Sequence, residues 1–137
     1  MIMKQRIWLV VTLLVITANV AIAVPQLKIK DTNLRCDKNF VNNGYSGCTL
    51  DIDLRIEDFS YSTTYNNYTY KVECDTTFQY LTTGSYSFPM SNSEYDHLNI
   101  YGTNITRTLS ITTNFYSINP VYKVGVSDLV CKVKDVY

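Results

Sequence analysis

Hydrophobic and polar residues alternate along most of the chain beyond residue 23. The clearest run, "CTLDIDLRIEDF" (48–59), places Leu50, Ile52, Leu54 and Ile56 at every second position, with charged residues between them. Successive side chains of a β-strand point to opposite faces, so this run predicts a strand with one apolar and one charged face. A strand of this kind is half buried, as in an antiparallel sheet.

The same alternation returns in "YTYKVECD", where Tyr68 and Tyr70 are expected to point inward, and in "ITRTLSITTNF". Shorter runs rich in β-branched and aromatic residues, such as "FQYL", "SYSF", "LNIY", "VYKVGV" and "LVCKVKDV", are separated by turn residues. The polar segments "STTYNNYTY" (62–70) and "MSNSEYDHLN" (90–99) are expected to be exposed loops.

Seven to nine short strands at this spacing predict an all-β fold, either a two-layer sandwich or a small barrel. For a domain of this length we favour the sandwich, antiparallel and immunoglobulin-like. Its two sheets would enclose an apolar interior that is either packed solid or opened around a lipid. The side chains expected to line this interior are Leu50, Ile52, Leu54, Ile56, Tyr70, Val72, Leu109, Ile111, Phe115 and Val124. These residue types suit a core and a lipid tunnel equally, so the pattern leaves both open.

The first 23 residues differ from the rest. "MIMKQRIWLVVTLLVITANVAIA" has a basic start, an apolar stretch of about 16 residues and an A-x-A site, which predicts a secretory signal peptide over residues 1–23. The stretch is shorter than the ~20 residues of a spanning helix, although an uncleaved anchor is an alternative. Cleavage of the 137-residue chain would leave 114 residues, 24–137, as a single secreted domain with no membrane span.

Charge narrows the class of partner. The chain has 12 basic and 12 acidic residues and the leader holds two of the basic ones, so residues 24–137 carry a net charge of −2. A near-neutral chain without a basic stripe argues against nucleic acid or an anionic membrane as the main partner.

The acidic residues of 48–59 raise the question of a metal site. Asp51 and Asp53 lie two apart on one strand face, close enough to share a calcium ion if further oxygen ligands converge on it. Arg55 and Lys71 are expected to neutralise the pair, and no calcium-loop motif follows. We therefore expect a solvated strand face with cross-strand ion pairs and no metal.

No set of residues predicts catalysis or a cofactor. The only histidine, His97, has Ser93 and Asp96 near it in sequence, but neighbours on one segment seldom converge as a triad. Two carboxylates acting on a glycosidic bond would need a deep cleft, which a small sandwich rarely offers. The chain is therefore expected not to be an enzyme.

Tyrosine is unusually frequent, with 12 residues in 137. It supplies rigid amphipathic contact area that suits protein or glycan interfaces, although strand preference alone accounts for many tyrosines. Tyr61 and Tyr65, in a polar segment, are the expected surface contacts. Asn67 and Asn104 begin N-x-T sequons and are glycosylation sites if the host cell makes such glycans.

The C-terminal third resembles the end of the ML lipid-recognition domain family. "GTNITRTLSITTNFYSINPVYKVGVSDLVCKV" follows that family's order of a G-T start, an alternating strand, a proline turn, a Y-x-V-x-V strand and a last strand with a cysteine. Gly102, Pro120, Tyr122 and Cys131 occupy the corresponding places. The resemblance implies a non-enzymatic carrier that holds a lipid between its two sheets.

Four cysteines in an oxidising compartment predict two disulfides, and the lack of a C-x-x-C pair argues against zinc. An immunoglobulin-like domain would join Cys74 to Cys131 across the sheets, whereas the ML resemblance implies Cys36–Cys131 and Cys48–Cys74. The short loop between Cys36 and Cys48 closes easily, so we predict Cys36–Cys48 and Cys74–Cys131.

Two functional hypotheses follow from these patterns. The first is a secreted binding protein that recognises an extracellular protein or glycan through loops and exposed tyrosines. The second is an ML-like lipid carrier.

Overall fold

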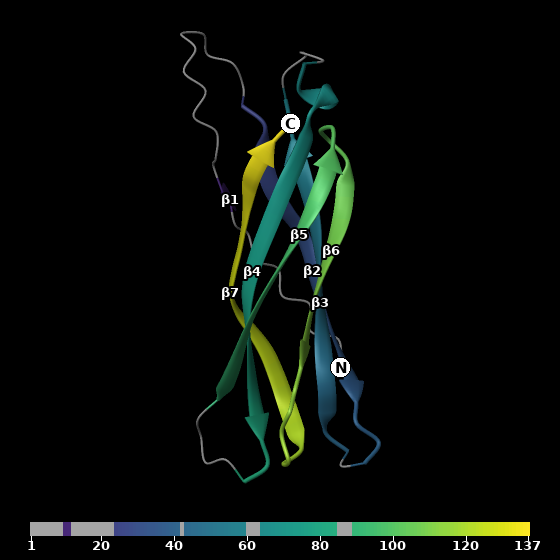
Figure 1. Cartoon of the computed structure of the whole chain (residues 1–137), viewed down its shortest axis with the longest axis vertical. Coiled ribbons are helices and arrows are strands. Elements are labelled where there is room, and N and C mark those ends of the chain that lie inside the picture. The colour runs from purple at the N-terminus through teal and green to yellow at the C-terminus, as the bar shows by residue number, and fades with distance from the viewer. Residues whose placement is uncertain (1–9, 12–23, 42, 60–63, 85–88) are drawn as a thin grey trace.

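The computed structural model describes residues 10–11, 24–41, 43–59, 64–84 and 89–137. Its elements are β1 (Val10–Val11), β2 (Gln26–Lys38), β3 (Tyr45–Glu57), the 3-10 helix η1 (Thr64–Asn67), β4 (Thr69–Thr82), β5 (Met90–Tyr101), β6 (Thr106–Asn114) and β7 (Val121–Val136). The long strands run along the main axis of an elongated molecule (Figure 1).

The strands form two antiparallel sheets, in the orders β1-β2-β3-β6 and β5-β4-β7. The predicted all-β fold with two antiparallel sheets is therefore confirmed. The predicted number of strands is corrected, because the described residues form six long strands besides the two-residue β1. Some runs that were expected to be separate strands are parts of one strand. "YTYKVECD", apart from its first residue, and "FQYL" both belong to β4, and "VYKVGV" and "LVCKVKDV" both belong to β7.

The segment 90–99, expected to be a loop, is most of strand β5. It pairs with β4 along its whole length, from Tyr101 opposite Thr69 to Met90 opposite Tyr80. β5 is an edge strand and few of its side chains are buried, so its sequence carries no apolar alternation to read. The other expected loop begins outside the described residues, continues as η1 and ends in β4.

The core lies between the two sheets. All ten side chains predicted for the interior belong to one apolar cluster; Phe115 is partly buried and the other nine are buried. Phe78 and Ile100, which the pattern did not single out, are fully buried in the same cluster. Tyr68 was expected to point inward but is 38% exposed, because it precedes β4 and strand alternation does not apply to it.

Both predicted disulfides form, Cys36–Cys48 and Cys74–Cys131. The expected position of the second is corrected: Cys74 on β4 and Cys131 on β7 are directly opposite each other within one sheet. Cys36 and Cys48 are opposite each other on β2 and β3 in the same way. Each disulfide thus ties neighbouring strands of one sheet, and the pairing implied by the ML resemblance is not formed.

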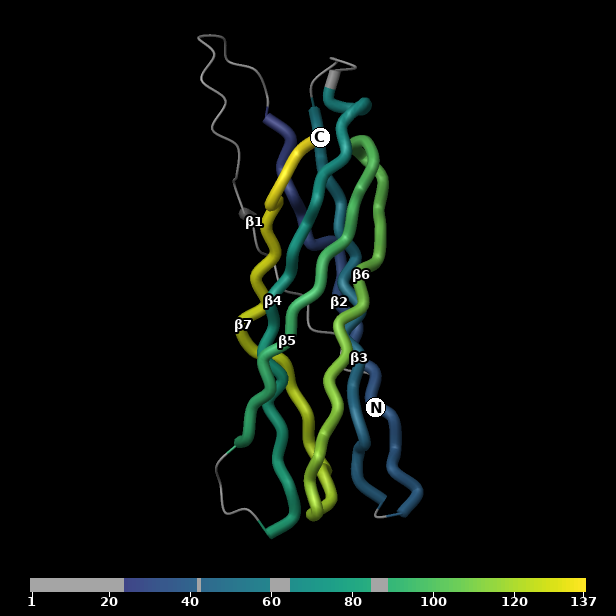
Figure 2. The backbone as a smooth tube through the Cα atoms, viewed as in Figure 1, coloured from purple at the N-terminus to yellow at the C-terminus, as the bar shows by residue number. Residues whose placement is uncertain are grey.

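Polar contacts join the sheets along the side where β5 faces β6. The Asn92 side-chain nitrogen donates to the Thr113 hydroxyl at 3.1 Å and to the Asn114 carbonyl at 3.2 Å. The Thr113 hydroxyl in turn donates to Glu94 at 3.2 Å. Figure 2 shows β5 and β6 side by side in the upper half of the molecule. These bonds and the core, rather than the disulfides, hold one sheet on the other.

Candidate functional site

The acidic side chains on the charged face of β3 are paired with side chains of the neighbouring strands. The Arg35 guanidinium on β2 donates two hydrogen bonds to Asp51, at 2.7 and 3.2 Å, and the Ser110 hydroxyl on β6 donates a third at 2.6 Å. The hydrogen bond from Arg35, with a smaller contribution from Ser110, lowers the pKa of Asp51 below its usual value. Asp53 accepts a hydrogen bond from Thr108 at 2.6 Å.

Glu57, at the end of β3, is clamped by two lysines of β2. Lys28 and Lys30 approach its two carboxylate oxygens at 2.7 and 2.8 Å, and its side chain is 9% exposed. Hydrogen bonds from Lys28 and then Lys30 lower the pKa of Glu57. Arg55 and Lys71 were expected to neutralise Asp51 and Asp53; instead Arg35 of β2 pairs with Asp51, and Lys71 lies on β4 in the other sheet.

This face carries ion pairs between β2 and β3 and hydroxyl hydrogen bonds from β6. Within the described ranges, no group of three or more His, Cys, Asp or Glu side chains is arranged to hold a metal ion. A bidentate arginine and short hydroxyl contacts of this kind position strands relative to each other.

His97 lies exposed on β5, next to Asp96, with 3.8 Å between the ring and the carboxylate. Ser93 is on the same strand four residues away, about 13 Å at ~3.3 Å per residue, and its hydroxyl pairs with Thr77 instead. The structure therefore does not bring Ser93 and His97 together.

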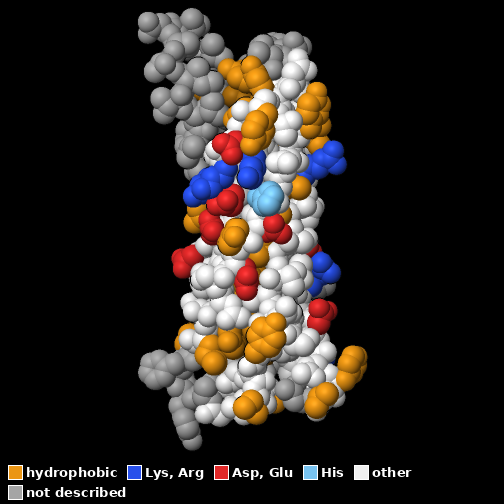
Figure 3. Space-filling model, in the orientation of Figure 1, with side chains coloured by type: hydrophobic (Ala, Val, Ile, Leu, Met, Phe, Trp, Pro, Cys, Tyr) orange, Lys and Arg blue, Asp and Glu red, His pale blue; other side chains and the backbone are white. Residues whose placement is uncertain are grey.

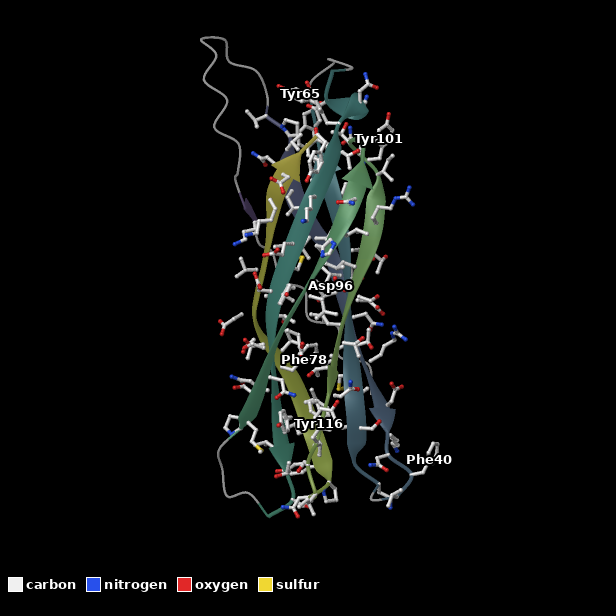
Figure 4. The ribbon with its side chains drawn as sticks, in the orientation of Figure 1. Phe40, Tyr65, Phe78, Asp96, Tyr101 and Tyr116 are labelled. Atoms are coloured by element: carbon white, nitrogen blue, oxygen red, sulfur yellow. A yellow bond between two sulfur atoms is a disulfide. The ribbon has the colours of Figure 1, made fainter. Side chains whose placement is uncertain are left out.

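Exposed aromatic side chains gather at the end of the molecule where the chain terminates. Tyr101 and Tyr137 are 62% and 68% exposed. The Tyr68 carbonyl bonds to Gly102, next to Tyr101, and Phe59 follows Asp58, which bonds to Asn104. Figure 4 labels Tyr65 and Tyr101 at this end. We call Phe59, Tyr65, Tyr68, Tyr101 and Tyr137 the tyrosine end.

Of the two surface tyrosines predicted from the sequence, Tyr65 belongs to the tyrosine end but is only half exposed, and its carbonyl accepts a hydrogen bond from the Tyr70 hydroxyl at 3.1 Å. Tyr61 lies outside the described residues. The more exposed Tyr101 and Tyr137 were missed because Tyr101 ends β5 and Tyr137 directly follows β7, and periodicity does not distinguish such positions from the strand interior.

Hydrogen bonds between segments hold the tyrosine end in place. The Gly102 amide donates to the Tyr68 carbonyl at 2.9 Å, and Thr69 and Tyr137 exchange two backbone bonds, at 3.0 and 2.9 Å. The Thr103 hydroxyl donates to the Asn66 side chain. The aromatic side chains therefore extend from a preformed backbone.

The two sequon asparagines occupy different settings at this end. Asn104, at φ 60°, donates from its side-chain nitrogen to the Asp58 carbonyl at 3.1 Å and accepts from the Asp58 amide at 3.2 Å. Asn67 is exposed at the end of η1. The glycan-accepting nitrogen of Asn104 is thus engaged in a loop contact.

A shallow groove of about 280 Å³ lies toward the other end of sheet β5-β4-β7 and opens to solvent. It is lined by Gln79, Tyr80, Leu81, Pro89, Lys123, Val124 and Gly125. Val124 is therefore both a core residue and part of a groove wall. The groove approaches the lower size limit of small-molecule sites, which are ~300–1,000 Å³.

Comparison with known proteins gives no relative: no family model, curated protein or solved structure matches the chain. Among the residues that the structure describes, no helix is long and apolar enough to cross a membrane.

Proposed function

We propose that the chain is a secreted, non-enzymatic binding module, immunoglobulin-like in the broad sense, that recognises a protein or glycan partner through the tyrosine end. The observation that carries the proposal is the concentration of exposed aromatic side chains on hydrogen-bonded segments at one end of a rod-shaped domain. Tyrosine rings bury large areas and their hydroxyls satisfy polar groups of a protein or a sugar. The leader pattern and the two disulfides support secretion.

Preorganisation supports this assignment further. Binding costs free energy when loops must first be ordered, and this cost is small where the backbone is already fixed. The contacts of Tyr68 and Tyr137 with neighbouring segments fix the backbone next to the exposed rings. A surface of this kind favours specific recognition over nonspecific binding.

The experiment probes glycan and extracellular-protein arrays with the purified, multimerised protein. Tyr101→Ser/Tyr137→Ser should lower the affinity for the partner roughly tenfold or more, because exposed tyrosines are frequent hot spots. Tyr95→Ser is the matched control, since Tyr95 is 70% exposed on β5 but lies outside the tyrosine end. Equal binding by the double variant and the wild type, or no partner on either array, would overturn the proposal.

The alternative function is the ML-like lipid carrier. Its lipid would lie in the apolar cluster that both sheets share, with Ile52 and Ile111 from one sheet and Val72 from the other. Native mass spectrometry tests it: a carrier would co-purify with lipid in near-stoichiometric amount, and Ile111→Trp would displace that lipid without unfolding the domain. Protein that is free of lipid and ignores fatty-acid and sterol probes would rule the carrier out.

A further inference from the structure

The end of the molecule opposite the tyrosine end carries four apolar side chains with almost no neighbours. Phe40 and Val41 lie between β2 and β3, Tyr116 and Ile118 lie between β6 and β7, and all four are between 94% and 98% exposed. We call these four residues the apolar tip. Figure 4 labels Phe40 and Tyr116 in the lower part of the molecule, and Figure 3 shows hydrophobic side chains gathered there.

The two loops of the apolar tip are fastened to each other. The Asn39 amide closes the first loop by donating to the Gly44 carbonyl at 2.6 Å, and the Phe115 amide ties the start of the second loop to β3 by donating to the Ser46 carbonyl at 2.9 Å. Gly44 packs directly against the second loop, because a Cβ on it would lie 2.7 Å from the Val121 nitrogen. The apolar tip is therefore a preformed unit built from both sheets.

Two lysines lie just behind the apolar tip. Lys38 ends β2 and Lys123 is near the start of β7; both are exposed, and neither belongs to the ion pairs that the described residues form. Asp37 adjoins Lys38 and offsets one of the two positive charges, so Asp37, Lys38 and Lys123 together keep a net positive charge. Lys38 precedes Phe40 by two residues, about 7 Å at the rise of an extended chain.

We propose that the apolar tip docks the protein on an anionic lipid surface, with its four side chains inserted in the interface and Lys38 and Lys123 among the headgroups. Interfacial side chains enter a bilayer by ~5–10 Å, which matches the spacing between Phe40 and Lys38. Two lysines at headgroup depth attract anionic lipid.

The shape of the apolar tip favours a lipid surface over a protein partner. Its side chains stand clear of their neighbours on a convex end, so a protein would need a separate pocket for each, whereas a fluid interface surrounds them without one. This interaction goes beyond the recognition proposed for the tyrosine end. Docking by the apolar tip would leave the tyrosine end facing away from the membrane (Figure 4).

Co-sedimentation with phosphatidylcholine vesicles, with and without phosphatidylserine, tests the proposal on the purified full chain. Phe40→Ser/Ile118→Ser should lower the vesicle affinity at least about tenfold, since two apolar side chains no longer insert. Tyr95→Ser/Val130→Ser is the matched control, because it also replaces one exposed aromatic and one exposed aliphatic residue, on β5 and β7. It should bind vesicles like the wild type.

Lys38→Gln/Lys123→Gln should reduce the phosphatidylserine-dependent part of the affinity, by about fivefold per lysine. All the substituted side chains are exposed, so the melting temperature checks that each variant is folded. The proposal would be overturned if the wild type and Phe40→Ser/Ile118→Ser bound vesicles equally. That result would arise, for example, if residues 1–23 alone bound the lipid. A second result would also overturn it: sedimentation velocity shows that the wild type is a dimer and that Phe40→Ser/Ile118→Ser is a monomer, while the wild type does not bind vesicles. Array binding by the tyrosine end should be unchanged in the apolar-tip variant, which separates this proposal from the previous one.

Discussion

Tyr70 links the core to the tyrosine end. Its ring is 1% exposed, and its hydroxyl donates to the Tyr65 carbonyl. Burial, with a smaller contribution from the negative charge of Asp58, raises the pKa of Tyr70 to about 12. The folded protein therefore holds this proton more tightly than the unfolded chain does, where tyrosine has its ordinary pKa of ~10.

This shift predicts a loss of stability in alkali. The contribution of Tyr70 is complete below pH ~10 and falls as the pH rises to ~12, by roughly 2–3 kcal/mol at ~1.4 kcal/mol per pH unit. Tyr70→Phe should remove this component of the loss, at a cost of ~1 kcal/mol at neutral pH for the hydrogen bond to Tyr65. Urea unfolding between pH 8 and 12 measures both effects. A wild-type loss equal to that of Tyr70→Phe would contradict the assignment, and Tyr95→Phe is the control for an exposed hydroxyl.

The two sequons predict unequal glycosylation. Secretion from a eukaryotic host should glycosylate Asn67, whereas a glycan on Asn104 would replace its bond to the Asp58 carbonyl. Peptide mapping should therefore show higher occupancy at Asn67. Asn104→Gln should lower stability by about 1 kcal/mol through lost bonds to Asp58, and Asn67→Gln should leave it unchanged. Full occupancy at Asn104 with no loss of stability would contradict this account.

Among the structural elements, the junction of the β2–β3 and β6–β7 loops depends on one glycine. A Cβ on Gly44 would lie 2.7 Å from the Val121 nitrogen and 2.9 Å from the Pro120 Cα, and neither backbone atom moves easily. Gly44→Ala should therefore destabilise the domain by about 1–3 kcal/mol. Gly125→Ala, on the same sheet as Val121, is the control, because a Cβ there meets nothing within 4 Å. Chemical unfolding compares the two, and equal stability would contradict the contact.

The sequence predicted the elements that bury one face. Leu50 to Ile56 alternate without interruption, and the core residues followed from that pattern because burial sets the period of a half-exposed strand. The end of β5 was predicted from the run "LNIY", but the rest of this strand was missed because an edge strand with few buried side chains has no such period. The pairing of Cys74 with Cys131 was predicted, but the position of β7 beside β4 in one sheet is a tertiary feature that no local pattern contains.

The candidate sites were less predictable than the fold. Composition indicated that tyrosine is abundant, but the exposure of Tyr101, Tyr116 and Tyr137 depends on where strands end and which loops meet. The net charge likewise argued against an anionic membrane. A net charge does not say where the charges lie, however, and Lys38 and Lys123 both lie behind the apolar tip. The exposed hydrophobic side chains of the two loops had no periodic signal at all.

At the scale of the whole molecule, the rod has a charged middle and two apolar ends. Charged side chains of both signs occupy the middle of the face shown in Figure 3, and the exposed hydrophobic side chains concentrate above and below them. Each disulfide reinforces one sheet and the core joins the two sheets, which makes the middle a rigid spacer. This arrangement supports two separate functions, recognition of a partner by the tyrosine end and docking on a lipid surface by the apolar tip.

Amide hydrogen exchange tests the central claim, recognition through the tyrosine end, most directly. The protein is compared alone and in complex with the partner found on the arrays. The account predicts slower exchange confined to the backbone around Tyr65–Thr69 and Tyr101–Ile105, with the middle of β5 around Tyr95 unchanged. Protection centred on the middle of β5, or spread over the core strands as a lipid between the sheets would produce, would contradict it.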